Sequence, residues 1–508
     1  MSLDGAQSIA TGGLAIINRQ MAIVSQNIAN ASTPDYAAER ATQSSVTADG
    51  MALGVISGAT RRSIDTALQA QVLQTGATVA ELGTTASALR SIDAALGTPG
   101  QGDDLPSLVG DLGNQFSALL GGPENQAQQA RVVASAGTLT QSLNRLSDAY
   151  AQQRQAAHDD IIASLATLNQ ALDTIGALSN RIIALKAGGN STSDLENQRD
   201  AALHTVCDLV SAKALVQTSG DMLVVTTAGL SLPTRRGADG ISLAGANLQP
   251  DMFHPGGGVP GIMIGGHDVT TQMLGGRIGA DLALRDRTLP TFQAELDEFA
   301  YTLATRFSAQ GLTLFTGPDG TVPAGSGTPA QSGYIGFAGT IGVNPSVQAD
   351  ARLVRDGTDA VTDNPAGASG FTPNPSGGPA GFTTLIDRVL TYALGTDIRS
   401  GVAQPASATT GLGPTGGLSA PYAAPATLLG LASAVATAQA SESAGAAAEL
   451  ETRQALHASL SSRLEAGSGV DIDAEMSLML SLQTAYSANA RVMTVVQGLF
   501  TELMNSVR

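Results

Sequence analysis

The side chains best suited to chemistry are one cysteine and five histidines, spread along a chain of 508 residues. Cys207 follows His204 by three residues within a predicted helix, so both would lie on one helix face. A thiolate beside an imidazole is an activated nucleophile pair. The alternative is a small buried hydrophobe next to a helical histidine, and we favour it. A single cysteine also excludes an intrachain disulfide and any metal site built from several thiolates.

The other polar constellations do not favour catalysis or metal binding. His254 and His267 share a predicted β-rich segment and could supply two ligands of one site, but no pattern of acidic residues accompanies them. Asp103–Asp104 and Asp159–Asp160 are adjacent carboxylates that would point in different directions on a helix, which is typical of solvated surface. The sequence also lacks H-E-x-x-H, G-x-S-x-G and Walker A motifs. We therefore predict no enzyme, no catalytic residues, no cofactor and no metal.

The charge of the chain excludes further classes of protein. Lys and Arg number 26 and Asp and Glu 43, so the net charge is −17. No basic patch for nucleic acid and no polybasic cluster for a membrane surface is present, and we expect neither partner. The most apolar run, 428–440, is shorter than the roughly 20 residues of a membrane span. Residues 1–30 lack the features of a cleavable signal peptide, so export would need another signal.

Both ends of the chain are predicted to form long amphipathic helices. Between residues 3 and 28 apolar side chains recur at spacings of three, four or seven, and Thr33-Pro34 ends the pattern. At the other end Gly467–Gly469 breaks the chain and Asp471 can cap a helix. That helix carries two apolar stripes, Leu478, Leu482, Ala485, Val492, Val496, Leu499 and Leu503, and Ile472, Met476, Met479, Tyr486, Ala490, Met493 and Phe500. A helix that is apolar on two faces requires more than one partner helix.

Between the ends, helical and β patterns alternate. Residues 124–187 contain no proline and carry two apolar stripes, which predicts a helical rod of about 95 Å. Short β-branched runs around Ser219-Gly220 predict a hairpin, and helices return at 285–310, 382–393 and 426–464. Two charge-free stretches, 320–349 and 400–441, predict surface excursions of loosely folded β structure or linker.

These patterns predict a mainly α, elongated, multi-domain protein with β insertions and with both termini at one end. The expected units are a terminal coiled-coil core, 1–36 plus 467–508, and a helical rod, 37–213 plus 281–466. The rod would carry excursions at about 320–380 and 400–425. A small all-β unit, 214–280, would be inserted in it.

Two terminal motifs resemble those of bacterial flagellar axial proteins. Residues 27–36 resemble the signature N-x-x-N-x-x-T-P-G-Y, with Asp35 in place of the glycine, and the matching positions are Asn27, Asn30, Thr33, Pro34 and Tyr36. Residues 468–476 and 482–492 are similar to the flagellar hook-associated protein 1 (FlgK) family, with Asp471 and Thr484 in place of the usual Asn and Gln. Segments 194–200, 275–290 and 341–345 resemble internal parts of the same family.

The resemblance implies a structural subunit of the bacterial flagellum that forms the hook–filament junction and acts as a polymerisation adaptor. It implies export through the flagellar type III channel to an extracellular position. The terminal helices would be mobile in the monomer and fold into a coiled-coil core on assembly. The implied partners are further copies in a ring, the hook protein, flagellar hook-associated protein 3, and an export chaperone on the C-terminal helix.

The expected assembly interface comprises Leu14, Ile17, Met21, Val24, Ile28, Met479, Leu482, Tyr486, Asn489, Arg491, Met493, Val496 and Phe500. We expect Tyr486, Asn489 and Arg491 to make hydrogen bonds between subunits, the alternative being that Tyr486 packs in the seam. Two other functions remain open: another axial protein, such as a hook or rod protein, and a secreted enzyme carried on a flagellar frame.

Overall fold

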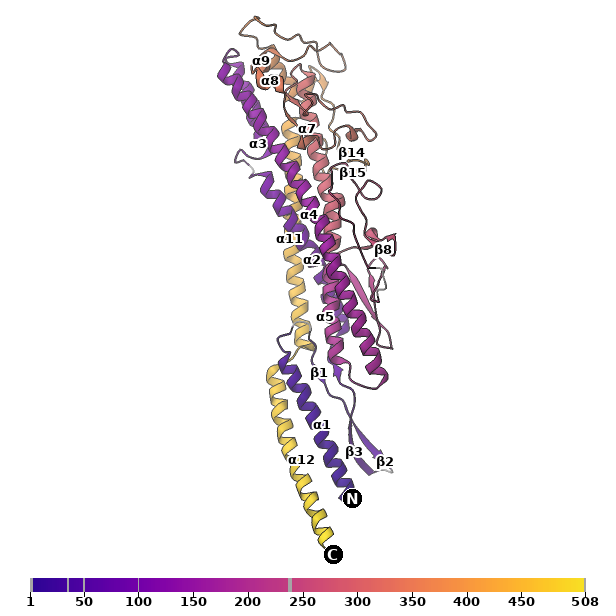
Figure 1. The fold of residues 1–508 in the computed structure, drawn as a ribbon. Helices are drawn as coiled ribbons and strands as arrows, with labels where there is room; N and C mark the ends of the chain where they lie inside the picture. The colour runs from indigo at the N-terminus through magenta and orange to yellow at the C-terminus, as the bar shows by residue number, and fades with distance from the viewer. Residues whose placement is uncertain (1–2, 34–35, 49–50, 99, 236–239, 507–508) are drawn as a thin grey trace.

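The computed structural model describes residues 3–33, 36–48, 51–98, 100–235 and 240–506. The molecule is a long helical rod, and the two ends of the chain lie together at its lower end (Figure 1). Small sheets of two or three strands line one side of the rod. The predicted mainly α, elongated fold with β insertions is confirmed.

The rod is built around one long helix. Helix α4 (Gln126–Ala187) spans 62 residues, begins where Asn125 caps the amide of Gln128, and ends before Gly188, as predicted. Its upper half packs against α3 (Leu105–Leu120) and α7 (Leu289–Ala309), and their apolar residues form the largest core cluster. One window of α4 is apolar enough, with a mean hydropathy of 1.3, to pass for a membrane span. Burial of its stripes against neighbouring helices accounts for that composition.

Two further helices complete the rod. Helix α2 (Thr66–Leu96) runs along α11 (Leu428–Ser468), and α2 also contacts α5 (Ser193–Leu209) and α6 (Gly276–Ala283). The helix predicted at 426–464 is confirmed, and it continues to the cap at Gly469.

A three-stranded sheet packs on the lower half of α4. Strands β5 (Ala212–Val216), β6 (Met222–Thr226) and β7 (Ser231–Leu232) are antiparallel in the order β5-β6-β7. The predicted hairpin around Ser219-Gly220 is confirmed, with Ala212 opposite Thr226 and Val216 opposite Met222. A second pair, β8 (Met263–Ile264) and β9 (His267–Asp268), follows before α6.

The excursions at the upper end are not linkers, because buried carboxylates on α7 hold them. Asp297 accepts hydrogen bonds from the amides of Gly336 (2.8 Å) and Ala338 (2.9 Å). Glu298 accepts from the Tyr334 hydroxyl at 2.6 Å and from an amide of the second excursion at 2.7 Å. The loose folding predicted for these stretches is therefore wrong where they contact α7. The remaining short strands and α-helices lie in these stretches or next to them: β10 (Phe315–Thr316), β11 (Gly342–Val343), α8 (Pro345–Ala349), α9 (Leu353–Asp356), α10 (Thr384–Arg388), β12 (Asp397–Arg399), β13 (Val402–Ala403), β14 (Thr410–Leu412) and β15 (Leu418–Ser419).

The two terminal helices, α1 (Leu3–Ala29) and α12 (Ile472–Ser506), lie side by side below the rod (Figure 1). Asp471 caps α12 by accepting from the Ala474 amide at 3.1 Å, as predicted. Between α1 and the rod the chain forms a hairpin of β2 (Gln43–Ala48) and β3 (Met51–Ser57), framed by the short pair β1 (Glu39–Arg40) and β4 (Arg61–Arg62). The sequence analysis missed this hairpin.

Candidate assembly interface

The terminal helices meet in a narrow apolar seam. Ile17 and Val24 of α1 and Leu482 of α12 are buried in it. The half-buried side chains that pack against them are Met21, Ile28, Met479 and Ala485. This part of the predicted residue set therefore comes together within one chain.

The lower part of the seam is less tightly packed. Val496 is buried, and Leu14, Met493 and Phe500 are half-buried. Asn489 faces Gly13 closely, since a Cβ atom at residue 13 would lie 3.4 Å from the Asn489 Oδ1. The Asn489 amide donates to the Ala485 carbonyl of its own helix at 3.2 Å, so its donor is engaged within the chain.

Outside the seam, α12 leaves many large apolar side chains exposed. The residues that contact α1 belong to both predicted stripes. They follow one heptad line along α12, from Met479 to Phe500, and this line crosses from one stripe to the other. Tyr486 is 39% exposed and Arg491 is exposed, so neither is buried in the seam of the single chain. The large apolar side chains left in solvent on α12 are Ile472, Met476, Leu478, Leu480, Val492, Val495, Leu499, Leu503 and Met504. These side chains lie on several sides of α12, and we call the set the outer face of α12.

A buried asparagine joins the terminal helices to the rod. The Asn27 side chain is 1% exposed, and its amide pairs with the backbone of Glu39 as a neighbouring strand would. Its Nδ2 donates to the Glu39 carbonyl at 2.9 Å, and its Oδ1 accepts from the Glu39 amide at 3.0 Å. The same side chain donates to Glu475 Oε1 of α12 at 3.1 Å and accepts from the Tyr36 hydroxyl at 3.1 Å. One residue thus connects α1, β1 and α12.

Acidic groups gather around this joint. Burial raises the pKa of Glu39, and the nearby carboxylates Asp194 and Glu196 raise it further while Arg62 lowers it. Burial, followed by neighbouring carboxylates that include Glu475, also raises the pKa of Tyr36, so its hydroxyl remains a donor at neutral pH. In the described part of the chain, Glu39 Oε1 is buried without a hydrogen-bond partner.

Arg62 fastens the joint to α5. Its guanidinium pairs with Glu196 at 3.0 Å and with Asp200 at 2.6 Å, and it donates to Asn197 Oδ1 at 3.2 Å. Asn197 in turn donates to the Ala37 carbonyl at 3.1 Å. A further bond runs from the Ala38 amide to the Ser468 carbonyl at 2.8 Å, at the end of α11. The joint therefore includes the N-terminal turn, α5 and the link between α11 and α12.

The other members of the family turn motif act locally. Asn30 donates from Nδ2 to the Gln26 carbonyl at 2.9 Å, and the Thr33 amide donates to the Asn30 carbonyl at 2.9 Å. Pro34 and Asp35 lie outside the described residues. Asn27 and Tyr36 therefore account for the described contacts of the motif that reach other elements.

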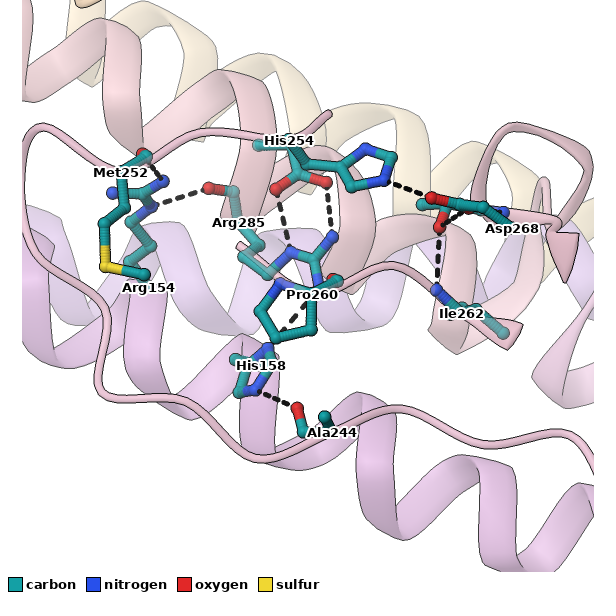
Figure 2. Close-up of polar contacts among 11 residues, drawn as sticks. Arg154, His158, Ala244, Met252, His254, Pro260, Ile262, Asp268 and Arg285 are labelled. Atoms are coloured by element: carbon teal, nitrogen blue, oxygen red, sulfur yellow. Dashed lines mark hydrogen bonds and ion pairs between the residues drawn. The ribbon is translucent and has the colours of Figure 1, made fainter. Parts of the chain in front are cut away.

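The residues with catalytic potential have structural surroundings. Cys207 is 1% exposed, and burial raises the pKa of its thiol to about 12, so it is no thiolate at neutral pH. His204 lies 3.8 Å from Asp208. His254 pairs with Asp268 of β9 at 2.8 Å (Figure 2). His267, the other residue of β9, is exposed. Among the described residues, no three His, Cys, Asp or Glu side chains gather so as to hold a metal ion.

Two buried arginines near His254 anchor the β insertion to the rod. Arg154 of α4 donates to the backbone carbonyls of Arg285 (2.8 Å), Gln249 (3.0 Å) and Met252 (2.6 Å) (Figure 2). Arg285 pairs with Asp286 at 2.7 Å. The described hydrogen bonds of both guanidinium groups run to protein groups, including the bond from Arg285 to the Pro260 carbonyl at 3.2 Å, so the cluster holds the loop in place.

Comparison with known proteins agrees with this architecture. Residues 89–320 match the helical domain of flagellar hook-associated protein FlgK, and residues 462–506 match the C-terminal domain of flagellar basal body rod proteins FlgEFG. Among solved structures, the flagellar hook junction protein FlgK from Burkholderia pseudomallei is 20% identical with a TM-score of 0.40, and the match covers 50% of this chain and 45% of that one. A comparison with curated proteins gave no match. The two matches, which include α3 to α7 and all of α12, support a structural protein of the FlgK type among flagellar hook-associated proteins.

Proposed function

We propose that the chain is the subunit that forms the junction between hook and filament and acts there as a polymerisation adaptor. The observation that carries the proposal is the outer face of α12, whose exposed fractions run from 47% at Leu478 to 69% at Met504. Large exposed apolar surfaces mark sites of association. Full burial of a large apolar side chain contributes roughly 1.5–3 kcal/mol, and these side chains have about half of that burial still to gain, so each contributes about 0.8–1.5 kcal/mol to packing against further helices.

The proposed occupants of that face are the terminal helices of neighbouring copies in a ring. The hook protein would lie on one side of the ring and flagellar hook-associated protein 3 on the other. Before export, a chaperone would cover the same helix. We propose that the terminal pair, 1–36 plus 467–508, is the core of the assembly. The rod, 37–213 plus 281–466, and the β unit, 214–280, would lie outside that core in the extracellular flagellum.

The predicted interface residues fall into two groups under this proposal. The first group would hold α1 and α12 of one subunit together: Leu14, Ile17, Met21, Val24 and Ile28 of α1, and Met479, Leu482, Met493, Val496 and Phe500 of α12. Tyr486 and Arg491, which the seam leaves exposed, are available to bind a neighbouring subunit. Asn489 would hold its hydrogen bond to its own helix and contribute packing.

Complementation by surface variants tests the proposal. Val495 is 62% exposed on the outer face, so Val495→Asp should leave the fold intact and block packing. Leu429, 48% exposed at the upper end of α11, provides the control Leu429→Asp. We expect cells that carry only the Val495 variant to lack filaments and cells that carry the Leu429 variant to swim. Normal filaments with Val495→Asp would contradict the proposal.

The second candidate function is that of another axial protein, such as a hook or rod protein. The match of residues 462–506 to the C-terminal domain of rod proteins favours this function. The helical-domain match at 89–320 favours the junction protein instead. Cells without the chain distinguish the two, because loss of a hook or rod protein removes the hook itself.

A further inference from the structure

A trough runs along the lower body of the molecule between α2 and β5, with α5 as its floor. Its volume is about 460 Å³. One wall consists of α2 side chains such as Ala70 and Leu73, and the other consists of all five residues of β5. The floor includes Leu203, which is 5% exposed, and Arg199, which is 2% exposed. The floor and the α2 wall are therefore mixed, with apolar positions such as Leu73 and Leu203 beside charged ones such as Arg199.

The β wall of the trough is an unpaired sheet edge. Strand β5 is the first in the order β5-β6-β7, and no described strand pairs with its other side. In an antiparallel pair, the N–H and C=O groups of alternate residues point away from the partner strand. Such an edge is a template for another strand. On the trough floor, the Arg199 Nε is buried without a hydrogen-bond acceptor in the described chain, so the trough also holds an unused donor.

The lip of the trough is apolar and exposed. Leu215 is 58% exposed and lies directly opposite Leu223, which is 38% exposed, and Val216 is 59% exposed. The one charged side chain on β5 is Lys213. The open edge and the apolar lip fit an extended, uncharged segment that adds to the sheet.

The chain itself carries such a segment. The hairpin β2–β3 extends beside α1, away from the rod (Figure 1), and its strands contain no charged residue. Strand β3 lies against α1, because a Cβ at Gly12 would lie 3.8 Å from the Val55 carbonyl oxygen. The hairpin has two strands, so β2 forms its other edge, which pairs with no further described strand. Ile56, 57% exposed, and Val55, 42% exposed, give β3 an apolar surface without a described partner.

We propose that the β2–β3 hairpin of one copy docks in the trough of a second copy, with β2 pairing with β5. The inference rests on the proposed function: the hairpin extends below the body beside α1 (Figure 1), so it can reach the trough of a neighbouring copy that is displaced downward along the long axis in the assembly. The trough is continuous with the joint that sets this geometry, since Arg62, Glu196 and Asp200 belong to both. The contact ties the outer bodies of adjacent subunits together.

Cysteine cross-linking of the full chain tests the proposal. Ser45→Cys places a thiol on exposed β2, and Leu215→Cys places one on β5. The natural Cys207 is buried, so the parent chain, which has no engineered cysteine, is the negative control for cross-linking. The control pairs Ser45→Cys with Leu429→Cys, a leucine of similar exposure at the far end of the rod. The single variants are mixed at a concentration at which the parent self-associates and are then oxidised.

We expect the Ser45–Leu215 mixture to yield at least about tenfold more mixed disulfide dimer than the control mixture, because docking raises the local thiol concentration. Equal yields while the parent self-associates and Val495→Asp abolishes that association would overturn the docking contact and leave the proposed function standing. A parent chain that does not self-associate at all would overturn both. Equal yields together with protection of the β5 amides by added hook protein would assign the trough to that partner instead.

Discussion

The joint centred on Asn27 gives the sharpest prediction. Replacing Asn27 by Ala removes four hydrogen bonds from a side chain that is 1% exposed. The backbone N–H and C=O of Glu39 would be left buried without their partner. A net bond contributes roughly 0.5–1.5 kcal/mol and a stranded buried group costs more, so we expect the joint to lose about 3–5 kcal/mol.

Hydrogen exchange measures this loss locally. The amide of Glu39 donates to Asn27, and the amide of Ala38 donates to the Ser468 carbonyl across the joint. A loss of 3–5 kcal/mol accelerates exchange at both amides by about two to three and a half orders of magnitude, because each 1.4 kcal/mol is tenfold. The interior of α4 should exchange as in the parent chain, since its core lies away from the joint.

The control is Asn30→Ala, in which the lost Nδ2 bond lies within the same turn. That variant should change exchange at Ala38 and Glu39 by less than about tenfold. If Asn27→Ala left both amides within threefold of the parent rate, the assignment of Asn27 as the connecting residue would be refuted.

Three further perturbations follow from the packing and the charges. Gly176→Ala places a Cβ against a backbone carbonyl of the facing loop and should lower the free energy of unfolding by about 1–3 kcal/mol. Gly137→Ala on the same helix meets open space and should raise it by about 0.5–1 kcal/mol. Thermal unfolding of the two variants and the parent chain measures both changes. Burial first, and a neighbouring acid second, raises the pKa of Asp281 to about 7. The folded state then holds a proton that the unfolded state has lost, so stability should fall by up to about 4 kcal/mol between pH 4 and pH 7, and Asp281→Asn should flatten that slope in denaturant titrations. Arg62→Leu removes two ion pairs at the joint and should increase proteolysis between α11 and α12, whereas Arg61→Leu on the same strand should not, because Arg61 is exposed.

The helical frame follows directly from the sequence. The stripes of residues 124–187, the cap at Asp471 and the end of α1 before Asn30 are all local patterns, and the structure has each of them in place. Local patterns do not predict structure that depends on contacts with a distant part of the chain. The excursions contain few charged residues and little regular structure. Asp297 and Glu298 nevertheless hold them by accepting hydrogen bonds from backbone amides and a tyrosine hydroxyl. No spacing of residues in the sequence predicts these contacts.

The missed hairpin had a usable signal. Asp49-Gly50 is a typical hairpin pair between two short runs, but polar residues such as Ser44 and Ser45 weaken the alternation that marks a strand. The motif around Asn27 carried the resemblance to flagellar axial proteins, but the pairing of its amide with the Glu39 backbone depends on a contact twelve residues away. The distribution of α12 side chains between the seam and the outer face likewise depends on where α1 lies.

Electron microscopy of cells that lack this chain tests the central claim most directly. The account predicts intact hooks without filaments and flagellin released into the medium, with filaments restored by the parent chain. Filaments attached to hooks in those cells would contradict the junction role.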